Sequence, residues 1–461
     1  MEVSDSRASG YSPLLVDFYE LTMAAGYFKH KKDARACFDL FIRDLPLRRS
    51  FFLACGLSDA VGFTQNLKFD EESVRYLDGL DIFQKDFLEY LREFKFTGDV
   101  WAMPEGTVFF PNEPVIRVVA PLIEAQLLES VLLNIINLQT TIATKAARVV
   151  LAAKGRKVFD FSLRRTHGSD AALKAARASY VAGFQATSNV LAGKTYGIPV
   201  VGTMAHSYVM AFSSELVSFE AYAEMFPKYT TLLVDTYDTL GGVRNAIVVA
   251  RELEKKNFRL SGIRIDSGNL GALADEARKL LDKAGFSYVK IFASGNLDEY
   301  KIKNLLEGGA PIDSFGVGTK MGVSADVPYS DVIYKLSEIT DISGEFSPTM
   351  KLSKGKVTYP GRKQVYRIRN KSGTFKKDVI ALENEVIKDG DPLLVKIIEK
   401  GKLVYRLPRL TDIRAFAASQ LSRLPLLQRQ LIRIAPYRVE VSPPLKALAK
   451  KLSRQVRQRI S

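Results

Sequence analysis

The chain has 461 residues, and 47 % of them are hydrophobic, which suits a folded protein of two or three domains. The net charge of +15 raises nucleic acid as a partner, but most of this charge lies in the last 61 residues, which carry 14 Lys and Arg against 2 acidic residues. No run of 18 uncharged apolar residues occurs, and the N-terminus lacks a basic start followed by an apolar stretch, so we expect a cytoplasmic protein without a membrane span.

The two ends of the chain predict a mixed layer of helices and strands. Residues 1–128 combine helical patterns with strands that contain Pro and Gly, such as "FTGDVWAMPEGTVFFPNEPVIRVV". Residues 346–440 begin with short strands joined by Pro and Gly turns. We expect these two segments to pack together as one discontinuous α+β domain.

The middle of the chain, 129–345, repeats a helix followed by a short apolar strand and then a polar cluster. Six strands show this pattern: "KVFDFS", "PVVGT", "LLVDT", "GIRID", "KIFAS" and "SFGVGT". Repeated β-α units build a parallel sheet, and six of them favour an α/β barrel that carries the active site. An open doubly wound sheet is the alternative, because strand order cannot be read from the sequence.

The last 21 residues, 441–461, form a basic helix or tail that includes "LKALAKKLSRQVRQRI". Such a segment either touches RNA or another anionic surface, or is a solvated helix whose long side-chain stems cover apolar surface. We favour the second interpretation and do not expect nucleic acid as a partner.

In a barrel, the residues that follow the strands share one rim, where enzymes of this architecture place their sites. Arginines, hydroxyls and glycine-exposed amides meet there, and these are groups that hold phosphates, so a phosphorylated metabolite is the expected substrate. The rim residues are Arg164, Arg165, His167, Thr203, His206, Ser207, Asp235, Asp238, Arg264, Asp266, Ser267, Ser294, Gly295, Asn296, Gly316, Gly318 and Thr319.

Several of these residues have a structural alternative. Arg164 and Arg165 are either phosphate ligands or surface charges. Asp266 either caps the helix that starts near residue 269 or contacts a ribose. Asp235 and Asp238 either hold Mg²⁺ through water or stabilise a turn. The sequence contains neither a GxxxxGK[ST] loop nor a GxGxxG motif, so no P-loop nucleotidase or dinucleotide domain is supported.

His206 is one of only three histidines and follows the apolar run "GIPVVGTMA". A histidine beside a strand is usually a hydrogen-bonded packing residue. At a phosphate-binding rim, a neutral imidazole can instead act as a base or as a nucleophile toward phosphate.

Taken together, the segments "LLVDFYELTMAAGYF", "FDLFIRDLP", "FSLRRTHGSDAAL", "SNVLAGKTYGIPVVGTMAHSYV", "DTYDTLGGVRNA", "GIRIDSGNL", "GVGTKMGVS" and "MKLSKGKVTYPGRKQVYR" resemble the nicotinate phosphoribosyltransferase family. The resemblance implies a type II phosphoribosyltransferase fold, an irregular α/β barrel with a second domain built from both termini, acting as a homodimer. It also implies that nicotinate and phosphoribosyl pyrophosphate give nicotinate mononucleotide and pyrophosphate in NAD salvage, with Mg²⁺ as cofactor and ATP as co-substrate.

The same resemblance implies roles for individual residues. His206 matches the histidine that ATP phosphorylates, and Asp266 matches a ribose contact with a catalytic role. Tyr19 is expected to stack on the nicotinate ring across the dimer, and Thr203 and Arg264 to lie near the nicotinate. Thr319 is expected in the phosphoribosyl phosphate site, and the other expected substrate-binding residues are Arg165, Ser267, Gly268, Gly316 and Gly318.

Two features leave alternatives open. "DSGN" has Asn269 where family members commonly show Asp, which puts a metal role of this position in doubt. A nicotinamide-specific phosphoribosyltransferase would share the barrel, and an inactive paralogue that binds phosphoribosyl pyrophosphate or RNA would share the motifs.

Overall fold

The computed structural model describes residues 11–353, 358–432 and 436–460. Its chain divides into two compact units, one formed by residues 1–144 and 329–461 and the other by residues 145–328. The sequence alone placed the barrel at 129–345, so its expected boundaries lie 16 and 17 residues outside the second unit. Each unit is described below by itself.

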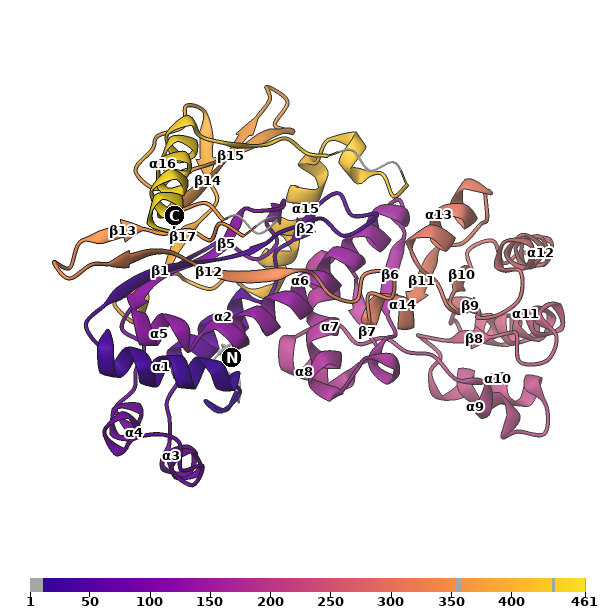
Figure 1. Ribbon diagram of the computed structural model, residues 1–461. Coiled ribbons are helices and arrows are strands. Elements are labelled where there is room, and N and C mark those ends of the chain that lie inside the picture. Colours follow the sequence, from indigo (N-terminus) through magenta and orange to yellow (C-terminus); the bar gives the residue numbers. More distant parts are fainter. Residues whose placement is uncertain (1–10, 354–357, 433–435, 461) are drawn as a thin grey trace. The chain divides into compact units, whose positions relative to one another are not determined.

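The second unit contains a six-stranded parallel sheet, in the order β7-β6-β11-β10-β9-β8 (Figure 1). Neighbouring strands pair in register, for example Ile291 of β10 with Ile263 of β9. The strands are β6 (Lys157–Asp160), β7 (Ala186–Thr187), β8 (Thr231–Leu233), β9 (Gly262–Ile265), β10 (Lys290–Ala293) and β11 (Ser314–Val317). The sheet forms half of a barrel with β7 and β8 at its edges, and the expected α/β fold class is thereby confirmed.

Five of the six strands predicted from the sequence are present, and the prediction for "PVVGT" is wrong. In that segment only Val200 makes a β-bridge, with Thr187 of β7. Gly197 ends the preceding helix in the left-handed region, at φ 68°, and Pro199 has no N–H to donate to a ladder. The segment lies beside the edge strand β7, where the Thr187 N–H donates to the Pro199 carbonyl oxygen and the Val201 N–H donates to the Thr187 carbonyl oxygen.

Helices connect the parallel strands. α11 and α12 contact each other and β9, and Figure 1 shows both helices beside the end of the sheet that contains β8, β9 and β10. Both are capped by side chains at their N-termini, Asp238 for α11 and Asn269 for α12. The helices are α7 (Ser169–Ala182), α8 (Val190–Tyr196), α9 (His206–Met210), α10 (Glu215–Met225), α11 (Thr239–Lys255), α12 (Leu270–Lys283), α13 (Glu299–Glu307) and α14 (Thr319–Gly322), with a 3-10 turn, η1, at Leu163–Arg165.

The first unit is built from strands that come from both ends of the chain. Its seven-stranded sheet has the order β13-β12-β1-β5-β3-β17-β18, in which β1 pairs antiparallel with both β12 and β5. The strands are β1 (Arg35–Ile42), β3 (Asp99–Ala102), β5 (Pro114–Pro121), β12 (Val332–Thr340), β13 (Phe346–Pro348), β17 (Val395–Glu399) and β18 (Lys402–Leu403).

Two smaller sheets complete this unit. The four-stranded sheet has the order β16-β14-β15-β19, and β2 pairs with β4. Their strands are β2 (Phe52–Leu53), β4 (Val108–Phe109), β14 (Lys363–Arg369), β15 (Phe375–Leu382), β16 (Gly390–Pro392) and β19 (Val439–Val441). The helices are α1 (Phe18–His30), α2 (Leu57–Asn66), α3 (Glu71–Asp78), α4 (Lys85–Arg92), α5 (Leu122–Gln126), α15 (Leu410–Arg423) and α16 (Pro443–Ile460), with a 3-10 turn, η2, at Leu426–Arg429.

Helix α6 (Glu129–Ala152) contains the division between the units. Together with α5 it forms the stretch Leu122–Ala152, which by length and composition alone would be apolar enough to cross a membrane. Of its most apolar window, 72 % is buried inside the structure. Such burial is typical of the core helix of a soluble protein.

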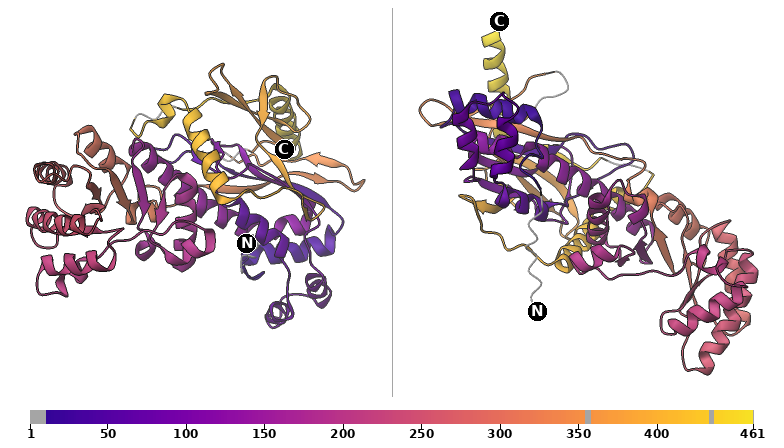
Figure 2. Two further views of the ribbon diagram at one scale, coloured as in Figure 1. Left: turned by 180° about the vertical axis from the view of Figure 1, so that it is seen from behind. Right: turned by 90° about the horizontal axis from the view of Figure 1, so that it is seen from below.

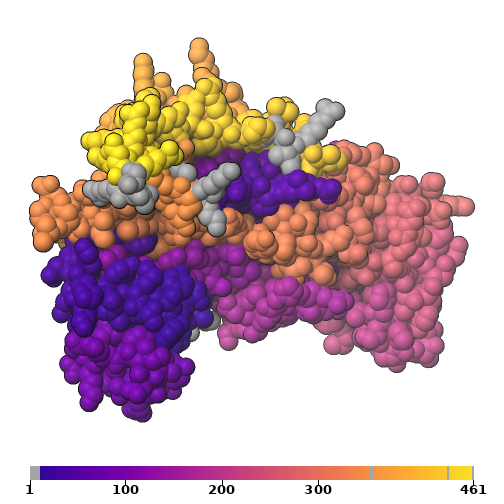
Figure 3. Space-filling view, in the orientation of Figure 1, coloured from indigo at the N-terminus to yellow at the C-terminus, as the bar shows by residue number. Residues whose placement is uncertain are grey.

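The basic C-terminal segment forms α16, which contacts β15. Leu445 is fully buried, whereas Lys446, Lys450, Lys451 and Arg454 are exposed. The helix lies at the surface of the first unit, and its last turns project away from that unit (Figures 2 and 3). One side of α16 therefore covers apolar surface while the charged side faces solvent.

Candidate active site

The carboxyl end of the parallel sheet holds a hydrogen-bond network around Arg264, which lies on β9. Its Nε donates to Ser294 Oγ at 2.7 Å, and its Nη2 donates to Asp266 Oδ1 at 2.7 Å. Its Nη1 donates to Thr203 Oγ1 at 3.1 Å and to the Met204 carbonyl oxygen at 3.3 Å. Because parallel strands end at the same edge, residues far apart in the sequence meet on one side chain.

Aromatic rings also hold the Arg264 guanidinium. Its central carbon lies 5.4 Å from the ring centre of Phe161 and 6.0 Å from that of Phe292. These distances fit cation–π contacts, which favour a fixed orientation of the planar group. Arg264 is thus a positioned cation, and Asp266 already occupies part of its hydrogen-bonding edge.

Asp266 is the anion of this network. Burial by itself would raise the pKa of its carboxyl group, but hydrogen bonds from Ser294 and Arg264 and the nearby charges of Arg264 and His206 outweigh burial and lower the pKa. Ser294 Oγ donates to Asp266 Oδ1 at 2.5 Å. Asp266 therefore stays ionised in the neutral range, as required of a group that stabilises a developing positive charge.

His206 is the first residue of α9, and it lies near the Arg264 network. Its Nδ1 is 3.2 Å from Thr236 Oγ1, and its charge contributes to the lowered pKa of Asp266. With Nδ1 held by the hydroxyl group, Nε2 is the ring nitrogen left for a reacting group. Sequence reasoning missed Thr236, although it lies inside the motif "DTYDT" that supplied Asp235 and Asp238.

Asp235 and Asp238 both have structural partners. Asp235 Oδ2 accepts hydrogen bonds from the Asp266 backbone N–H at 2.9 Å and from Ser267 Oγ at 2.6 Å. Asp238 Oδ2 accepts from the Gly241 backbone N–H at 2.6 Å and caps α11. The geometry accordingly shows the turn-stabilising role of these carboxylates, which the sequence left open beside a role in holding Mg²⁺ through water.

A direct metal site is not built here. Among the described residues, no three His, Cys, Asp or Glu side chains are grouped so that they could hold a metal ion. Asp235 Oδ1 is buried and has no hydrogen-bond partner within the described part of the chain.

Asn269, and not Asp266, caps the helix that follows β9. Its Oδ1 accepts a hydrogen bond from the Ala272 backbone N–H at 3.3 Å and caps α12. An asparagine caps a helix about as well as an aspartate, so local folding explains this position without a metal. Asp266 remains available for the Arg264 network.

The glycines of "GVGTKMG" are explained first by close packing. A Cβ on Gly316 would lie 2.8 Å from the Phe292 ring and 2.9 Å from the Phe161 ring. A Cβ on Gly318 would lie 2.8 Å from the Phe161 carbonyl oxygen. Gly316 is buried, whereas Thr319 is exposed at the start of α14, where its hydroxyl can reach a ligand.

The next residue, Lys320, is held by an ion pair. Its Nζ lies 2.7 Å from Asp298 Oδ2, and Asp298 also caps α13. The pair joins the turn after β11 to the start of α13. Sequence reasoning did not single out either residue, because neither spacing nor composition distinguishes them.

The remaining predicted residues lie outside the Arg264 network. Arg165 ends η1 and is exposed, and Ser267 and Gly268 form the exposed turn after β9, in which Gly268 has φ +76°. Tyr19 belongs to α1 in the first unit, is 45 % exposed, and donates a hydrogen bond to Glu129. The roles suggested for these residues stay predictions.

Comparison with known proteins identifies the family of this chain. Three family models match it in order: the NAPRTase N-terminal domain over residues 14–137, the "Nicotinate phosphoribosyltransferase (NAPRTase) family" over 156–375, and the C-terminal domain over 389–449. The chain belongs to the nicotinate phosphoribosyltransferase family. The resemblance inferred from the sequence motifs is therefore confirmed.

Members of this family match nearly the whole chain. It is 49 % identical to nicotinate phosphoribosyltransferase pncB2 of Mycobacterium tuberculosis, over 91 % of this chain and 89 % of that protein. It is 41 % identical to nicotinate phosphoribosyltransferase of Bacillus subtilis, over 93 % and 92 %. The crystal structure of human nicotinic acid phosphoribosyltransferase matches with a TM-score of 0.84 at 30 % identity and covers 95 % of this chain and 99 % of that one.

Proposed function

We propose that this chain is an ATP-dependent nicotinate phosphoribosyltransferase of NAD salvage, which joins nicotinate and phosphoribosyl pyrophosphate to give nicotinate mononucleotide and pyrophosphate. The observation that carries the proposal is the Arg264 network, in which Asp266, Ser294 and Thr203 meet one positioned cation beside His206. Family membership along the whole chain supports the same reaction.

In the proposed transfer, the bond between C1 of the ribose and the pyrophosphate oxygen breaks, and its electron pair leaves with pyrophosphate. The pyridine nitrogen of nicotinate then donates its lone pair to form the new C1–N bond. The ionised Asp266 lies where it would stabilise positive charge on the sugar. Mg²⁺, bound to the phosphates, would supply neutralisation of the leaving group.

Arg264 and Thr203 would face the nicotinate. A guanidinium can pair with the carboxylate that distinguishes nicotinate from nicotinamide. Because Arg264 already donates to Ser294 and Asp266 from Nε and Nη2, and twice more from Nη1, we expect the substrate carboxylate to meet the remaining N–H of Nη2. Tyr19 of the partner subunit would stack on the pyridine ring in a cytoplasmic homodimer.

ATP coupling would run through His206. The γ-phosphoryl group of ATP would pass to the imidazole to give ADP and phosphohistidine, and water would later release phosphate. The hydrogen bond between Nδ1 and Thr236 supports this step because it fixes the ring and leaves Nε2 as the nitrogen that can react with phosphate. This coupled hydrolysis is the reason to class the enzyme as a ligase.

The test mixes purified protein with nicotinate, phosphoribosyl pyrophosphate and Mg²⁺, with and without ATP, and measures nicotinate mononucleotide. Nicotinamide replaces nicotinate in a parallel reaction. We expect product from nicotinate, more product with ATP, and no ATP effect in the variant His206→Ala. Absence of product from the wild-type protein would refute the transferase, and full ATP stimulation of His206→Ala would refute the phosphohistidine.

A further inference from the structure

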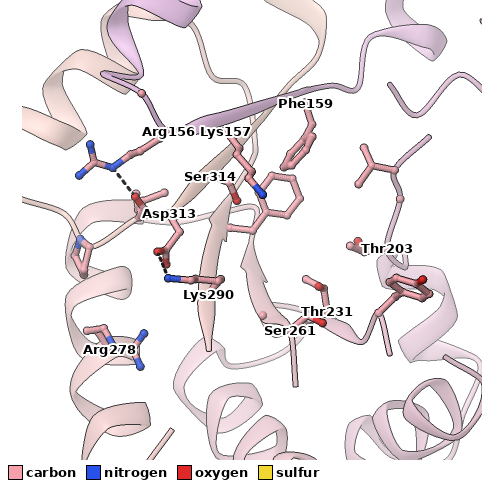
Figure 4. A pocket seen from close by; sticks show the side chains of 18 of the residues that line it. Arg156, Lys157, Phe159, Thr203, Thr231, Ser261, Arg278, Lys290, Asp313 and Ser314 are labelled. Carbon is pink, nitrogen blue, oxygen red and sulfur yellow. Dashed lines mark hydrogen bonds and ion pairs between the residues drawn. The ribbon is translucent and has the colours of Figure 1, made fainter. Parts of the chain in front are cut away.

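A cavity of about 1030 Å³ opens at the amino end of the parallel sheet, opposite the edge that holds the Arg264 network (Figure 4). The first residues of five strands line it: Lys157, Thr231, Gly262, Lys290 and Ser314. All residues predicted for the active site lie in the part of the chain that the structure describes. Among them, only Thr203 lines this cavity. The cavity therefore needs an explanation of its own.

Positive charge gathers at the mouth of the cavity. Arg156, Lys157, Arg278 and Lys290 line it; Lys290 is paired with Asp313 at 3.0 Å and Arg278 with Asp282 at 2.8 Å. Arg156 uses its Nε for the Ile312 carbonyl oxygen, and Lys157 is exposed and has no ion pair within the described residues. An excess of cations around a concave surface attracts and holds an anion.

Aromatic side chains form the inner wall. The rings of Phe159 and Phe292 meet edge to face, with centres 5.7 Å apart, and Phe292 meets Phe161 in the same way at 5.6 Å. Val200 and Val201 add apolar surface. A ligand that fits both parts of the cavity has an aromatic ring at one end and a negative charge at the other.

The spacing of these groups suits a nucleotide. Lys157 and Phe159 are two residues apart on β6, so they face the same side and lie about 7 Å apart along the strand. Lys290 and Phe292 repeat this arrangement on β10. Each strand thus offers a cation and an aromatic ring at a separation close to that between the 5′-phosphate and the base of a mononucleotide, and the volume is ample for one.

We propose that this cavity is a second ligand site, which binds a mononucleotide with its phosphate at Lys157 and its base against Phe159 and Phe292. Phe292 lines the cavity and its ring centre lies 6.0 Å from the Arg264 guanidinium, and Thr203 borders both places, because it lines the cavity and accepts a hydrogen bond from Arg264 Nη1. The phosphate and base contacts proposed here use none of the active-site residues proposed above, so the two proposals can fail separately.

Calorimetric titration of the full chain with AMP tests the site, because AMP has no γ-phosphate to transfer to His206. We expect AMP to bind, Lys157→Ala to weaken binding about tenfold through loss of a charged hydrogen bond, and Lys157→Glu to weaken it further. Adenosine and inorganic phosphate, titrated separately, are each expected to bind more weakly than AMP.

Two variants serve as controls. Lys283→Glu reverses an exposed charge on α12 outside the cavity and should leave AMP binding unchanged. His206→Ala alters the active site and should also leave it unchanged, which separates this site from the proposed reaction. No binding of AMP, equal binding by both Lys157 variants and the wild type, or loss of binding in His206→Ala would overturn the proposal, and phosphate alone binding as tightly as AMP would overturn the nucleotide assignment.

Discussion

The two ends of the parallel sheet differ in how their polar groups are used. At the carboxyl end, Arg264 donates to Ser294, Thr203, Met204 and Asp266 within one network. At the amino end, Lys157 lies at the mouth of a cavity without an ion pair among the described residues. A network in which most donors already have partners fixes geometry, whereas a charge without an ion pair beside a cavity attracts a ligand.

The largest expected effect comes from removing the centre of the carboxyl-end network. Arg264→Ala should lower kcat/KM for nicotinate about a hundredfold to a thousandfold, because it removes a preorganised cation and frees Asp266. It should also raise the pKa of Asp266, whose carboxyl group would lose a hydrogen bond and a neighbouring positive charge. Steady-state kinetics against pH measure both effects, with an acid limb that moves to higher pH.

The matched control is Arg251→Ala, which removes an exposed arginine from α11. We expect wild-type kinetics from this variant. If Arg264→Ala were as active as Arg251→Ala, the carboxyl end would not be the reacting end of the sheet.

A smaller effect is expected from Thr236, which contacts His206 Nδ1. Thr236→Val keeps the shape of the side chain but removes the hydroxyl group, so the imidazole loses its orienting partner and phosphohistidine should form about tenfold more slowly. Thr236→Ser restores the hydroxyl group and should restore the rate. Labelling with [γ-³²P]ATP measures this step, with phosphohistidine identified as protein-bound label that is stable in base and lost in acid.

The control for the Thr236 variants is the phosphoribosyl transfer reaction measured without ATP. Its rate should be similar in Thr236→Val and in the wild type, since the hydroxyl group acts through His206. If phosphohistidine formed at the same rate in Thr236→Val and Thr236→Ser, the hydrogen bond between Thr236 and His206 would have no role in coupling.

Gly316 lies between the two ends, beneath the phenylalanine rings. Gly316→Ala would place a methyl group 2.8 Å from Phe292 and 2.9 Å from Phe161 and should cost about 1–3 kcal/mol of folding free energy through overpacking. Urea denaturation measures this loss. Gly26→Ala, in α1 with no atom within 4 Å of the added carbon, should be neutral or stabilising, and an equal loss in both variants would contradict the packing argument.

The smallest effect concerns Glu215, which is buried on α10 and whose Oε2 accepts a hydrogen bond from Asn245 at 2.9 Å. Burial, together with the charges of Asp238 and Asp235, raises the pKa of its carboxyl group. The ionised form therefore costs stability above the raised pKa, and this cost disappears as the pH falls through that value.

Glu215→Gln removes the charge at every pH and keeps an acceptor for Asn245. We expect it to raise Tm by about 2 °C at pH 8, with a difference from the wild type that shrinks as the pH is lowered. Calorimetric scans at several pH values measure this. A lower Tm for the variant at pH 8 would show that the charge is stabilised rather than strained.

Local sequence patterns determined much of this protein. Alternating helical and strand patterns gave five of the six predicted parallel strands, because periodicity and turn residues act over short distances. The motifs around His206, Arg264 and Asp266 identified the family, and Pro- and Gly-containing segments at both ends indicated the second, mixed α+β part.

The tertiary structure decided what each polar group does. "PVVGT" makes a single bridge to β7 rather than a strand, after a glycine that ends α8 and at a proline that has no N–H to donate. Asp238 and Asn269 cap helices, and Asp266 accepts a hydrogen bond from Arg264 instead of capping α12. Thr236 meets His206 from 30 residues away, and the amino-end cavity gathers the starts of five strands. These contacts join residues that are distant in the chain, so they follow from strand order and the close packing of side chains, which no local pattern encodes.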